Sequence, residues 1–390
     1  MGDVPQIHGD CDPKFRLVRE AFENNFKNDL ELGAAVAVTV DARPVVDLWA
    51  GFADPERTRP WERDTLVNVY STTKGMTAIC AHQLVDQGLL DLDQKVAHYW
   101  PEFAQGGKGD IPVRYLLSHQ AGLPAIRTPL TVEESFEPEA MAKALAAQEP
   151  WWEPGTKHGY HAVTFGWLVG ELVRRISGKK SLGTYFQEKI AGPFGLDFHI
   201  GLHDKDHDRV AFITQIPPAP SDFEPNLFKI MIEQPESVLA KTFMNPPYLA
   251  IKNLANTPHW RRAEIPAGNG HGTARALARI YGALACGGEL DGIRVFSPES
   301  IERARTEQSR GPDEVLIVET RFGLGFMMPV PGSPMGPNNQ AFGHPGAGGS
   351  LGFADPEAHI GFGYVMNLTA ADILINERPK ALIEALYQSL

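Results

Sequence analysis

The chain begins with a helical hydrophobic period and then changes to a strand-like one. Hydrophobic residues recur every three or four positions over 13–30, which predicts an amphipathic helix. Two apolar, β-branched runs, 34–40 and 45–51, are joined by turn residues and predict a β-hairpin. A short extended run then leads into a helix that we expect to begin near Ser71 and to end at Gly88, with an apolar stripe along one face.

Strand signals fade in the middle of the chain and return near its C-terminal end. Proline and glycine separate short helical segments such as 138–148 and 162–176. The expected C-terminal elements are strands over 323–328, 349–354 and 359–367 and a helix over 376–390. This order predicts an α/β chain in which both ends build one sheet, with a long, mainly helical insert between them. We therefore divide it into a sheet domain, 1–89 with 261–390, and an insert domain, 90–260, with the active site between them.

Composition and charge narrow the range of partners. The 390 residues are 43% hydrophobic and 22% charged, which is ordinary for a globular protein, and no apolar run approaches the length of a membrane helix. A net charge of -12 without a basic cluster disfavours nucleic acid and anionic lipid surfaces. Three widely spaced cysteines form no disulfide framework. With an N-terminus that lacks a basic start and an apolar stretch, this composition predicts a cytoplasmic protein.

A serine and a lysine three residues apart stand at the expected start of the helix, in Ser71-Thr72-Thr73-Lys74. Residues at this spacing share a helix face, so the hydroxyl and the amine can meet. A serine hydroxyl needs an adjacent base to become a nucleophile, and a lysine can supply that base once burial has lowered its pKa. Taken alone, the tetrapeptide is more often an N-cap serine beside a solvated lysine.

Tyr160 lies in a polar, glycine-flanked loop directly before a predicted helix. A phenol beside an ammonium can exchange a proton with the serine or the leaving group, because a positive neighbour favours phenolate. Lys74 and Tyr160 would then titrate as a coupled pair, and the sequence leaves open which of the two is the formal base. The alternative is a buried tyrosine whose hydroxyl is satisfied elsewhere.

The segment 342–350 is dense in glycine within a strand-like pattern. Such density indicates a bulge or a backbone that lies against a ligand, where N–H groups can bind a developing oxyanion. The predicted donors are the Ser71 amide at the helix start and the Ala347 amide on the strand. The same segment contains a Gly-x-Ser-x-Gly match at Ser350, but a strand-like run follows it where a nucleophile elbow requires a helix.

Together these elements resemble the serine β-lactamase and penicillin-binding-protein superfamily, whose signature is Ser-x-x-Lys, a Tyr-x-Asn-type element and Lys/His-Thr-Gly on a strand. The elements that carry the resemblance are Ser71 to Lys74, Tyr160-His161-Ala162, His344-Pro345-Gly346 and the Leu-Leu-Ser-His-Gln-Ala-Gly-Leu stretch 116–123. The resemblance spans roughly residues 15–388. It implies a β-lactamase-like fold with an antiparallel sheet flanked by helices, and places His344 and Gly346 at the substrate.

Two departures from the signature make the chain most similar to the family VIII carboxylesterases of this superfamily. Ala162 stands where penicillin-recognising members usually carry an asparagine, and Pro345 lacks the hydroxyl and the N–H of threonine. Both changes remove polar groups that recognise a lactam or a D-Ala-D-Ala substrate. A simple ester needs neither of these groups for binding. His344 stands where most members of the superfamily carry a lysine that is not part of the proton-transfer pair. We therefore expect His344 to influence the electrostatics around the active site rather than to act as the base. Aromatic residues of the insert, including Trp152, are candidates for an acyl pocket or for core packing.

These features predict a serine carboxylesterase that hydrolyses short- to medium-chain esters through an acyl-enzyme on Ser71. The alternatives are a β-lactamase, D-Ala-D-Ala carboxypeptidase or amidase that uses the same residues, and a non-catalytic binding protein that kept the fold. The expected partner is a small-molecule ester. We expect no cofactor, no metal ion, no nucleic acid and no membrane partner, and a homo-oligomer is compatible with the sequence.

Overall fold

Both ends of the chain contribute strands to one antiparallel sheet. The computed structural model describes residues 4–215, 227–370 and 372–390. Within them the main sheet has the order β1-β3-β2-β14-β13-β12, and every neighbouring pair is antiparallel. Its strands are β1 (His8–Cys11), β2 (Gly33–Val40), β3 (Arg43–Gly51), β12 (Phe342–Pro345), β13 (Leu351–Asp355) and β14 (Ile360–Met366). The predicted sheet built from both chain ends is confirmed.

The predicted N-terminal hairpin is formed by β2 and β3. Its turn residues Asp41 and Ala42 both have positive φ, 50° and 59°, which is the geometry of a type I′ turn that suits the twist of the two strands. A register shift between Val38 and Thr39 bends the hairpin. β2 then pairs with β14 along seven residues, from Ala34 to Val40, and so joins the two chain ends at the centre of the sheet.

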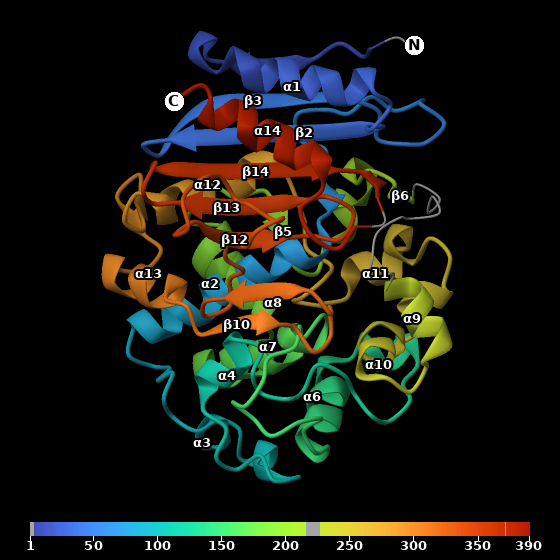
Figure 1. Cartoon of the computed structure of the whole chain (residues 1–390), viewed down its shortest axis with the longest axis vertical. Helices are drawn as coiled ribbons and strands as arrows, with labels where there is room; N and C mark the ends of the chain where they lie inside the picture. The colour runs from blue at the N-terminus through green and yellow to red at the C-terminus, as the bar shows by residue number, and fades with distance from the viewer. Residues whose placement is uncertain (1–3, 216–226, 371) are drawn as a thin grey trace.

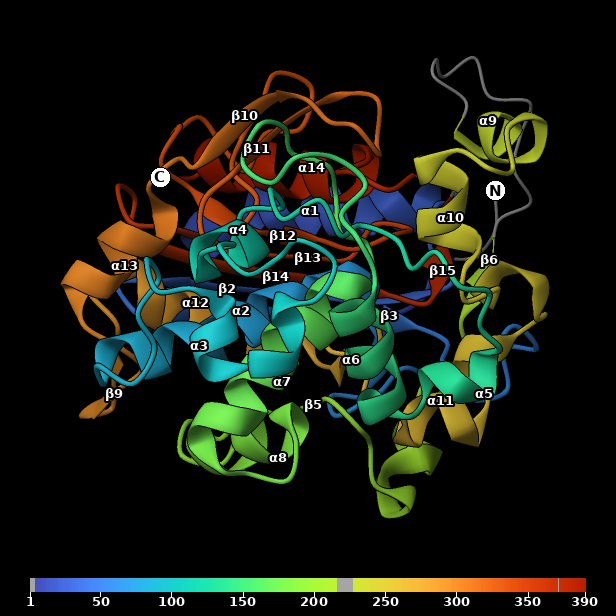
Figure 2. The ribbon, with the colours of Figure 1, turned by 90° about the horizontal axis from the view of Figure 1, so that it is seen from below.

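Helices cover both faces of the sheet (Figures 1 and 2). The terminal helices α1 (Arg16–Lys27) and α14 (Glu377–Tyr387) lie on one face, and α12 (Ala274–Ala285) lies on the other. α12 approaches β14 so closely that a Cβ on Gly361 would lie 2.2 Å from the backbone nitrogen of Gly282. Only glycine permits that contact, which fixes how deeply the helix sits against the sheet.

α2 (Thr73–Asp86) is buried on all sides, and the predicted apolar stripe along one face is therefore wrong. Residues 73–85 are all buried, including Lys74 and His82. The helix lies between the sheet layer and the helices α7 (Thr164–Ser177) and α8 (Leu182–Phe186), so no face is left for solvent. A helix in such a central position carries apolar residues on every face, apart from polar residues with a functional role.

The segment between the two halves of the sheet is mainly helical, as the sequence predicts. Its helices are α3 (Val96–Tyr99), α4 (Val113–Leu117), α5 (Val132–Ser135), α6 (Pro138–Ala147), α7, α8, α9 (Leu227–Glu233), α10 (Val238–Met244) and α11 (Pro258–Arg262). They fill the lower half of Figure 1. The division into a sheet domain and an insert domain stays a prediction. No helix in the described ranges has both the length and the apolar character that a bilayer span requires.

Small sheets and bridges connect these layers. They consist of β4 (Val67–Asn68) with β7 (His271–Gly272) and β5 (Phe198–His199), β6 (Thr214–Gln215) with β15 (Leu368–Thr369), β8 (Glu289–Leu290) with β9 (Ile293–Arg294), and β10 (Ser309–Pro312) with β11 (Glu319–Phe322). The strand expected over 323–328 is not formed. The strand lies just before it, as β11, because Gly325 has a positive φ of 87° and ends the extended run. α13 (Pro298–Arg305) precedes the β10–β11 hairpin.

Candidate active site

Ser71 lies on a tight turn rather than on the first turn of an α-helix. β4 leads into a 3₁₀ turn, Tyr70–Thr72, and α2 begins two residues later than expected, at Thr73. Tyr70 has a φ of 45°, a strained value for a non-glycine residue. The Ser350 hydroxyl supports this turn, since it donates to the Val69 carbonyl at 2.8 Å. As expected, a strand, β13, follows Ser350.

Lys74 faces Ser71 across the start of α2. Its Nζ lies 3.0 Å from Ser71 Oγ, 2.6 Å from the Ala162 carbonyl and 2.9 Å from the Ala267 carbonyl. The side chain has no solvent exposure. Burial alone holds the pKa of Lys74 well below its ordinary value, because a charged ammonium would lose its hydration there. The expected contact between the hydroxyl and a neutral amine is present.

Tyr160 stands over this pair, in the loop that precedes α7. Its ring centroid lies 4.7 Å from Lys74 Nζ, and its ring stacks on Phe322 of β11 and on His344 of β12. Burial raises the pKa of Tyr160, a hydrogen bond with the Ser71 hydroxyl lowers it by less, and the carboxylate of Asp313 raises it further. An ammonium at Lys74 would favour phenolate, but burial disfavours that ammonium as well. The phenol keeps its proton chiefly because burial disfavours the charged phenolate.

The imidazoles around the site are also neutral. Burial lowers the pKa of His344 to about 3, and its Nδ1–H donates to the Pro345 carbonyl at 2.7 Å. Burial likewise lowers the pKa of His161 to about 3. His161 donates from Nδ1 to the Gly159 carbonyl and accepts the Leu123 N–H at Nε2. His344 thus contributes a neutral, stacked ring, and no imidazolium charge reaches Lys74.

The glycine-rich turn after β12 packs against the turn that carries Ser71. β12 ends at Pro345, so Ala347 lies in the turn beyond the strand and not on the strand as predicted. Gly346 donates its N–H to the Ser350 carbonyl at 2.7 Å. A Cβ on Gly346 would lie 2.3 Å from the Val69 carbonyl oxygen and 2.2 Å from Ser350 Oγ. Glycine is required here because the two turns touch.

Trp152 lies beside the tyrosine loop and is partly buried. Its ring meets that of His161 edge-on at 6.3 Å, and a Cβ on Gly159 would lie 2.7 Å from its ring. The indole therefore packs against the backbone that carries Tyr160. Of the predicted site residues, the structure brings together Ser71, Lys74, Tyr160, His344 and Gly346, and it places Trp152 behind the tyrosine loop.

Comparison with known proteins adds the family. The protein-family model described as Beta-lactamase matches residues 22–383. The chain belongs to the β-lactamase family. It is 38% identical to the Esterase/beta-lactamase LipL of Mycobacterium tuberculosis (strain ATCC 25618 / H37Rv), over 95% of this chain and 85% of that protein.

Solved structures agree with this assignment. The crystal structure of a family VIII carboxylesterase is 43% identical, with a TM-score of 0.91 over 99% of this chain and all of that one. EstA from Arthrobacter nitroguajacolicus Rue61a is 32% identical, with a TM-score of 0.84 over 98% of this chain and 99% of that one. The fold is the β-lactamase-like fold, and the chain is a serine hydrolase of this family. Both expectations are confirmed.

Several groups at the site of this β-lactamase-family chain carry no signal in the sequence. The carbonyls of Ala162 and Ala267 accept from Lys74, and any residue type could supply them. Phe322 and Asp313 come from the β10–β11 hairpin, far along the chain from Tyr160. Only contact in the folded protein reveals them, since no motif spacing links segments so distant.

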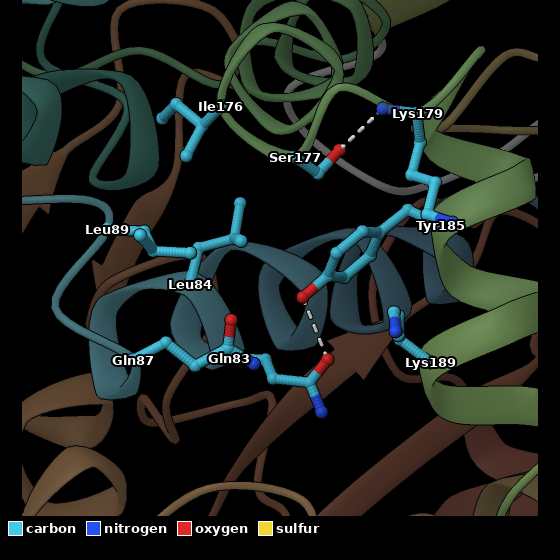
Figure 3. A pocket seen from close by; sticks show the side chains of 9 residues that line it. All are labelled: Gln83, Leu84, Gln87, Leu89, Ile176, Ser177, Lys179, Tyr185 and Lys189. Carbon is cyan, nitrogen blue, oxygen red and sulfur yellow. Dashed lines mark hydrogen bonds between the residues drawn. The ribbon is translucent and has the colours of Figure 1, made fainter.

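A separate pocket of about 220 Å³ lies at the other end of α2 (Figure 3). It is lined by Gln83 of α2, by Gln87 directly after that helix and by residues of α7 and α8, and the Tyr185 hydroxyl donates to Gln83 Oε1 at 2.8 Å. Nine residues separate Gln83 from Lys74, which is roughly 13 Å along a helix. The pocket contains none of the residues predicted for catalysis and lies outside the family's site.

Proposed function

We propose that this chain is a serine carboxylesterase that hydrolyses short- to medium-chain esters through an acyl-enzyme on Ser71. The family VIII carboxylesterase at 43% identity and the esterase EstA support the ester as substrate class. The proposed mechanism rests on the contacts around Lys74 Nζ, because these contacts indicate which group accepts the proton of Ser71.

A neutral lysine amine has two N–H donors and one lone pair. Two of the three oxygens around Lys74 Nζ are carbonyls, of Ala162 and Ala267, and carbonyls can only accept. Once both N–H groups are used on them, the lone pair is left for the third oxygen, Ser71 Oγ, at 3.0 Å. In this arrangement Ser71 donates its proton to Lys74 as its Oγ attacks the ester carbonyl.

Tyr160 serves as the acid of the first step. Its raised pKa keeps the phenol protonated, and the hydrogen bond with Ser71 puts that proton beside the reacting atoms. As the bond between the carbonyl carbon and the alcohol oxygen breaks, the departing alkoxide takes the phenolic proton. The Lys74 ammonium then returns its proton to Tyr160. In the second step a water gives its proton to the same pair and attacks the acyl carbon. As the bond between that carbon and Ser71 Oγ breaks, the pair returns the proton to Oγ, and the acid is released.

The amides of Ser71 and Ala347 stabilise the oxyanion in this proposal. Within the described parts of the chain, the Ala347 N–H donates to no backbone carbonyl, whereas its neighbour Gly346 is already bonded to Ser350. A free donor next to the serine turn is what a developing oxyanion requires, and losing one donor typically costs about 3 kcal/mol.

Substrate choice follows from groups that are absent at the signature positions. Ala162 has no side-chain amide, and its carbonyl is taken by Lys74. Pro345 has no hydroxyl, and its carbonyl is taken by His344. We assign His344 and Gly346 to the substrate wall, and Trp152 to the support of the tyrosine loop that it packs against. An ester needs no further polar group there, whereas a lactam carboxylate would.

A panel of p-nitrophenyl esters of increasing acyl length, assayed with a chromogenic cephalosporin, tests this proposal. We expect turnover of short and medium esters and little or none of the cephalosporin. Ser71→Ala should abolish ester hydrolysis, and a fluorophosphonate should add its mass to Ser71 in the wild type only. Efficient cephalosporin turnover without ester turnover, or an active Ser71→Ala variant, would show that the proposal is wrong.

A β-lactamase activity is the second candidate, because the relative LipL carries both activities in its name. The same panel separates the two. A cytoplasmic location and a homo-oligomer stay predictions, which cell fractionation and light scattering would check.

A further inference from the structure

Asp313 is a buried carboxylate that reaches the tyrosine loop from a distant part of the chain. It follows β10 directly and opens the connection to β11. The residue is 2% exposed. Burying a carboxylate costs free energy unless its oxygens are fully hydrogen-bonded. The hydrogen-bond partners of Asp313 therefore indicate its role.

The carboxylate of Asp313 has four donors. Oδ1 accepts the N–H groups of Val315 and Leu316, both at 2.8 Å, and the N–H of Tyr160 at 3.0 Å. Oδ2 accepts the hydroxyl of Thr320 at 3.0 Å. Three of these bonds shape the β10–β11 connection itself. The fourth crosses 153 residues to Tyr160, and that bond is not needed to fold the hairpin.

A second chain of contacts runs in parallel and ends at the same loop. Thr320 gives its only proton to Asp313, so it accepts from His158 Nε2–H at 2.9 Å. The Glu314 N–H donates to the His158 carbonyl at 3.1 Å. His158 and Tyr160 lie on either side of Gly159, and both are thereby tied to the hairpin that starts at Asp313.

The ring of Tyr160 is held by the same hairpin. Phe322, at the end of β11, stacks on it with an interplanar angle of 9° and a centroid distance of 6.3 Å. Asp313 therefore orients the backbone of Tyr160 while Phe322 orients its ring. Displacing a catalytic group by about 1 Å typically costs about a hundredfold in rate, so such anchoring matters for a proton donor.

We propose that Asp313 is a positioning residue that holds the Tyr160 phenol at the leaving group. This inference rests on the proposed esterase mechanism. Asp313 touches neither the substrate nor Ser71, and it acts through the Tyr160 amide. Its loss should harm the step that needs the phenolic proton more than the step that activates the serine.

Two esters with the same acyl group separate these steps. p-Nitrophenolate leaves without a proton, whereas the alkoxide of ethyl butyrate needs one. For Asp313→Ala we expect kcat/KM on ethyl butyrate to fall about a hundredfold, and on p-nitrophenyl butyrate to fall by only a few-fold. Asp313→Asn keeps Oδ1 as acceptor for the Tyr160 N–H, so it should restore most of the ethyl butyrate activity. Glu314→Gln, a neighbour that loses a surface ion pair with Lys157 and keeps the bond from its N–H to the His158 carbonyl, should behave as wild type.

The contrary outcomes are distinct. Equal loss on both esters in a folded Asp313→Ala variant, or no loss on either, would overturn the positioning role. If Asp313→Ala does not fold, Thr320→Val decides in the same way, because it removes the Oδ2 donor and the His158 acceptor together. Tyr160→Phe serves as reference: if it slows both esters equally, the acid role in the proposed function fails whatever Asp313 does, and an active Ser71→Ala variant would reject the proposed function itself.

Discussion

Two buried lysines, Lys74 and Lys108, differ in their surroundings and in the role that we propose for each. Lys108 donates to the carbonyls of Gln105, Ala146 and Gln148, so all three protons of an ammonium have acceptors. Burial lowers its pKa only to about 8. Lys74 has two carbonyls and one hydroxyl, and its pKa lies well below the ordinary value. Burial lowers both pKa values, and the nearby carboxylate of Glu149 raises that of Lys108, so Lys108 fits a structural cation and Lys74 the proposed neutral base.

Replacing each lysine by methionine tests this difference. Lys74→Met should lower kcat/KM by about 10²–10⁴-fold on both p-nitrophenyl and ethyl butyrate, because every ester needs the serine to lose its proton. Lys108→Met should lower the melting temperature and leave kcat/KM of the folded enzyme close to wild type. Steady-state kinetics on folded protein, checked by thermal unfolding, makes the comparison. An unimpaired Lys74→Met variant would contradict the assignment of the base.

The pH profile reports on Lys74 as well. Protonation of the amine on acidification removes the base, so kcat/KM should rise with pH along an acidic limb that lies well below the range of an ordinary lysine. Above that limb the rate should level off, since the raised pKa of Tyr160 keeps its proton in place. Burial raises the pKa of Glu31 to about 7, and this residue is the control. Glu31→Gln should leave the limb in place; if the limb vanishes, it belongs to Glu31.

At the scale of elements, the site depends on how closely two turns approach each other. The turn after β12 touches the 3₁₀ turn before α2, with Gly346 at the contact and Ser350 bonded across it. α2 starts at Thr73, after this turn, so that Ser71 directly follows the strained residue Tyr70 while Lys74 has regular helical geometry. The strand, the turn and the helix each hold one part of the site.

Gly346→Ala tests the contact between the turns. Its Cβ would overlap the Val69 carbonyl oxygen and Ser350 Oγ, so one turn must move away from the other. We expect kcat/KM to fall about a hundredfold or more, the size that accompanies the loss of an oxyanion donor. Gly109→Ala is the matched control, since its Cβ would have no neighbour closer than 3.9 Å. Steady-state kinetics on both variants makes the comparison. A wild-type kcat/KM for Gly346→Ala would show that the contact between the turns is not needed for activity.

At the scale of the whole molecule, Arg378 ties the two chain ends to the same region. This buried residue of α14 donates to the carbonyls of Leu30, Leu368 and Gly348 and pairs with Glu31 at 3.3 Å. Gly348 is the neighbour of Ala347, so the guanidinium anchors the proposed oxyanion turn from behind. Closure of the sheet by both termini and the geometry of the site are thus linked.

Arg378→Met should reduce the free energy of unfolding by about 3–5 kcal/mol, because it leaves Glu31 buried and unpaired. The effect should be measured by chemical denaturation at alkaline pH, because the Glu31 pKa of about 7 already includes the lowering by Arg378 and rises once the guanidinium is removed. Adding Glu31→Gln should recover part of the loss, since the second change removes the uncompensated charge. If Arg378→Met alone were as stable as wild type, the ion pair would contribute nothing to the free energy of unfolding.

The sequence by itself determined the elements and pairs that depend on local spacing. The N-terminal hairpin, the C-terminal helix, the sheet from both chain ends and the meeting of Ser71 with Lys74 all follow from short-range patterns or from their order. Local patterns failed where burial decides. They predicted a stripe on α2 and a strand over 323–328, and they left the protonation of the Lys74 and Tyr160 pair open.

Only the tertiary structure decided the chemistry of the site. The acceptors of Lys74 come from segments 88 and 193 residues away, and the Tyr160 amide is held by a residue 153 positions distant. The pKa values of Lys74 and Tyr160 depend on the loss of hydration, which all surrounding segments produce together. Burial is a property of the packed chain, and for this reason the spacing of residues could locate the proton-transfer pair but not its protonation state.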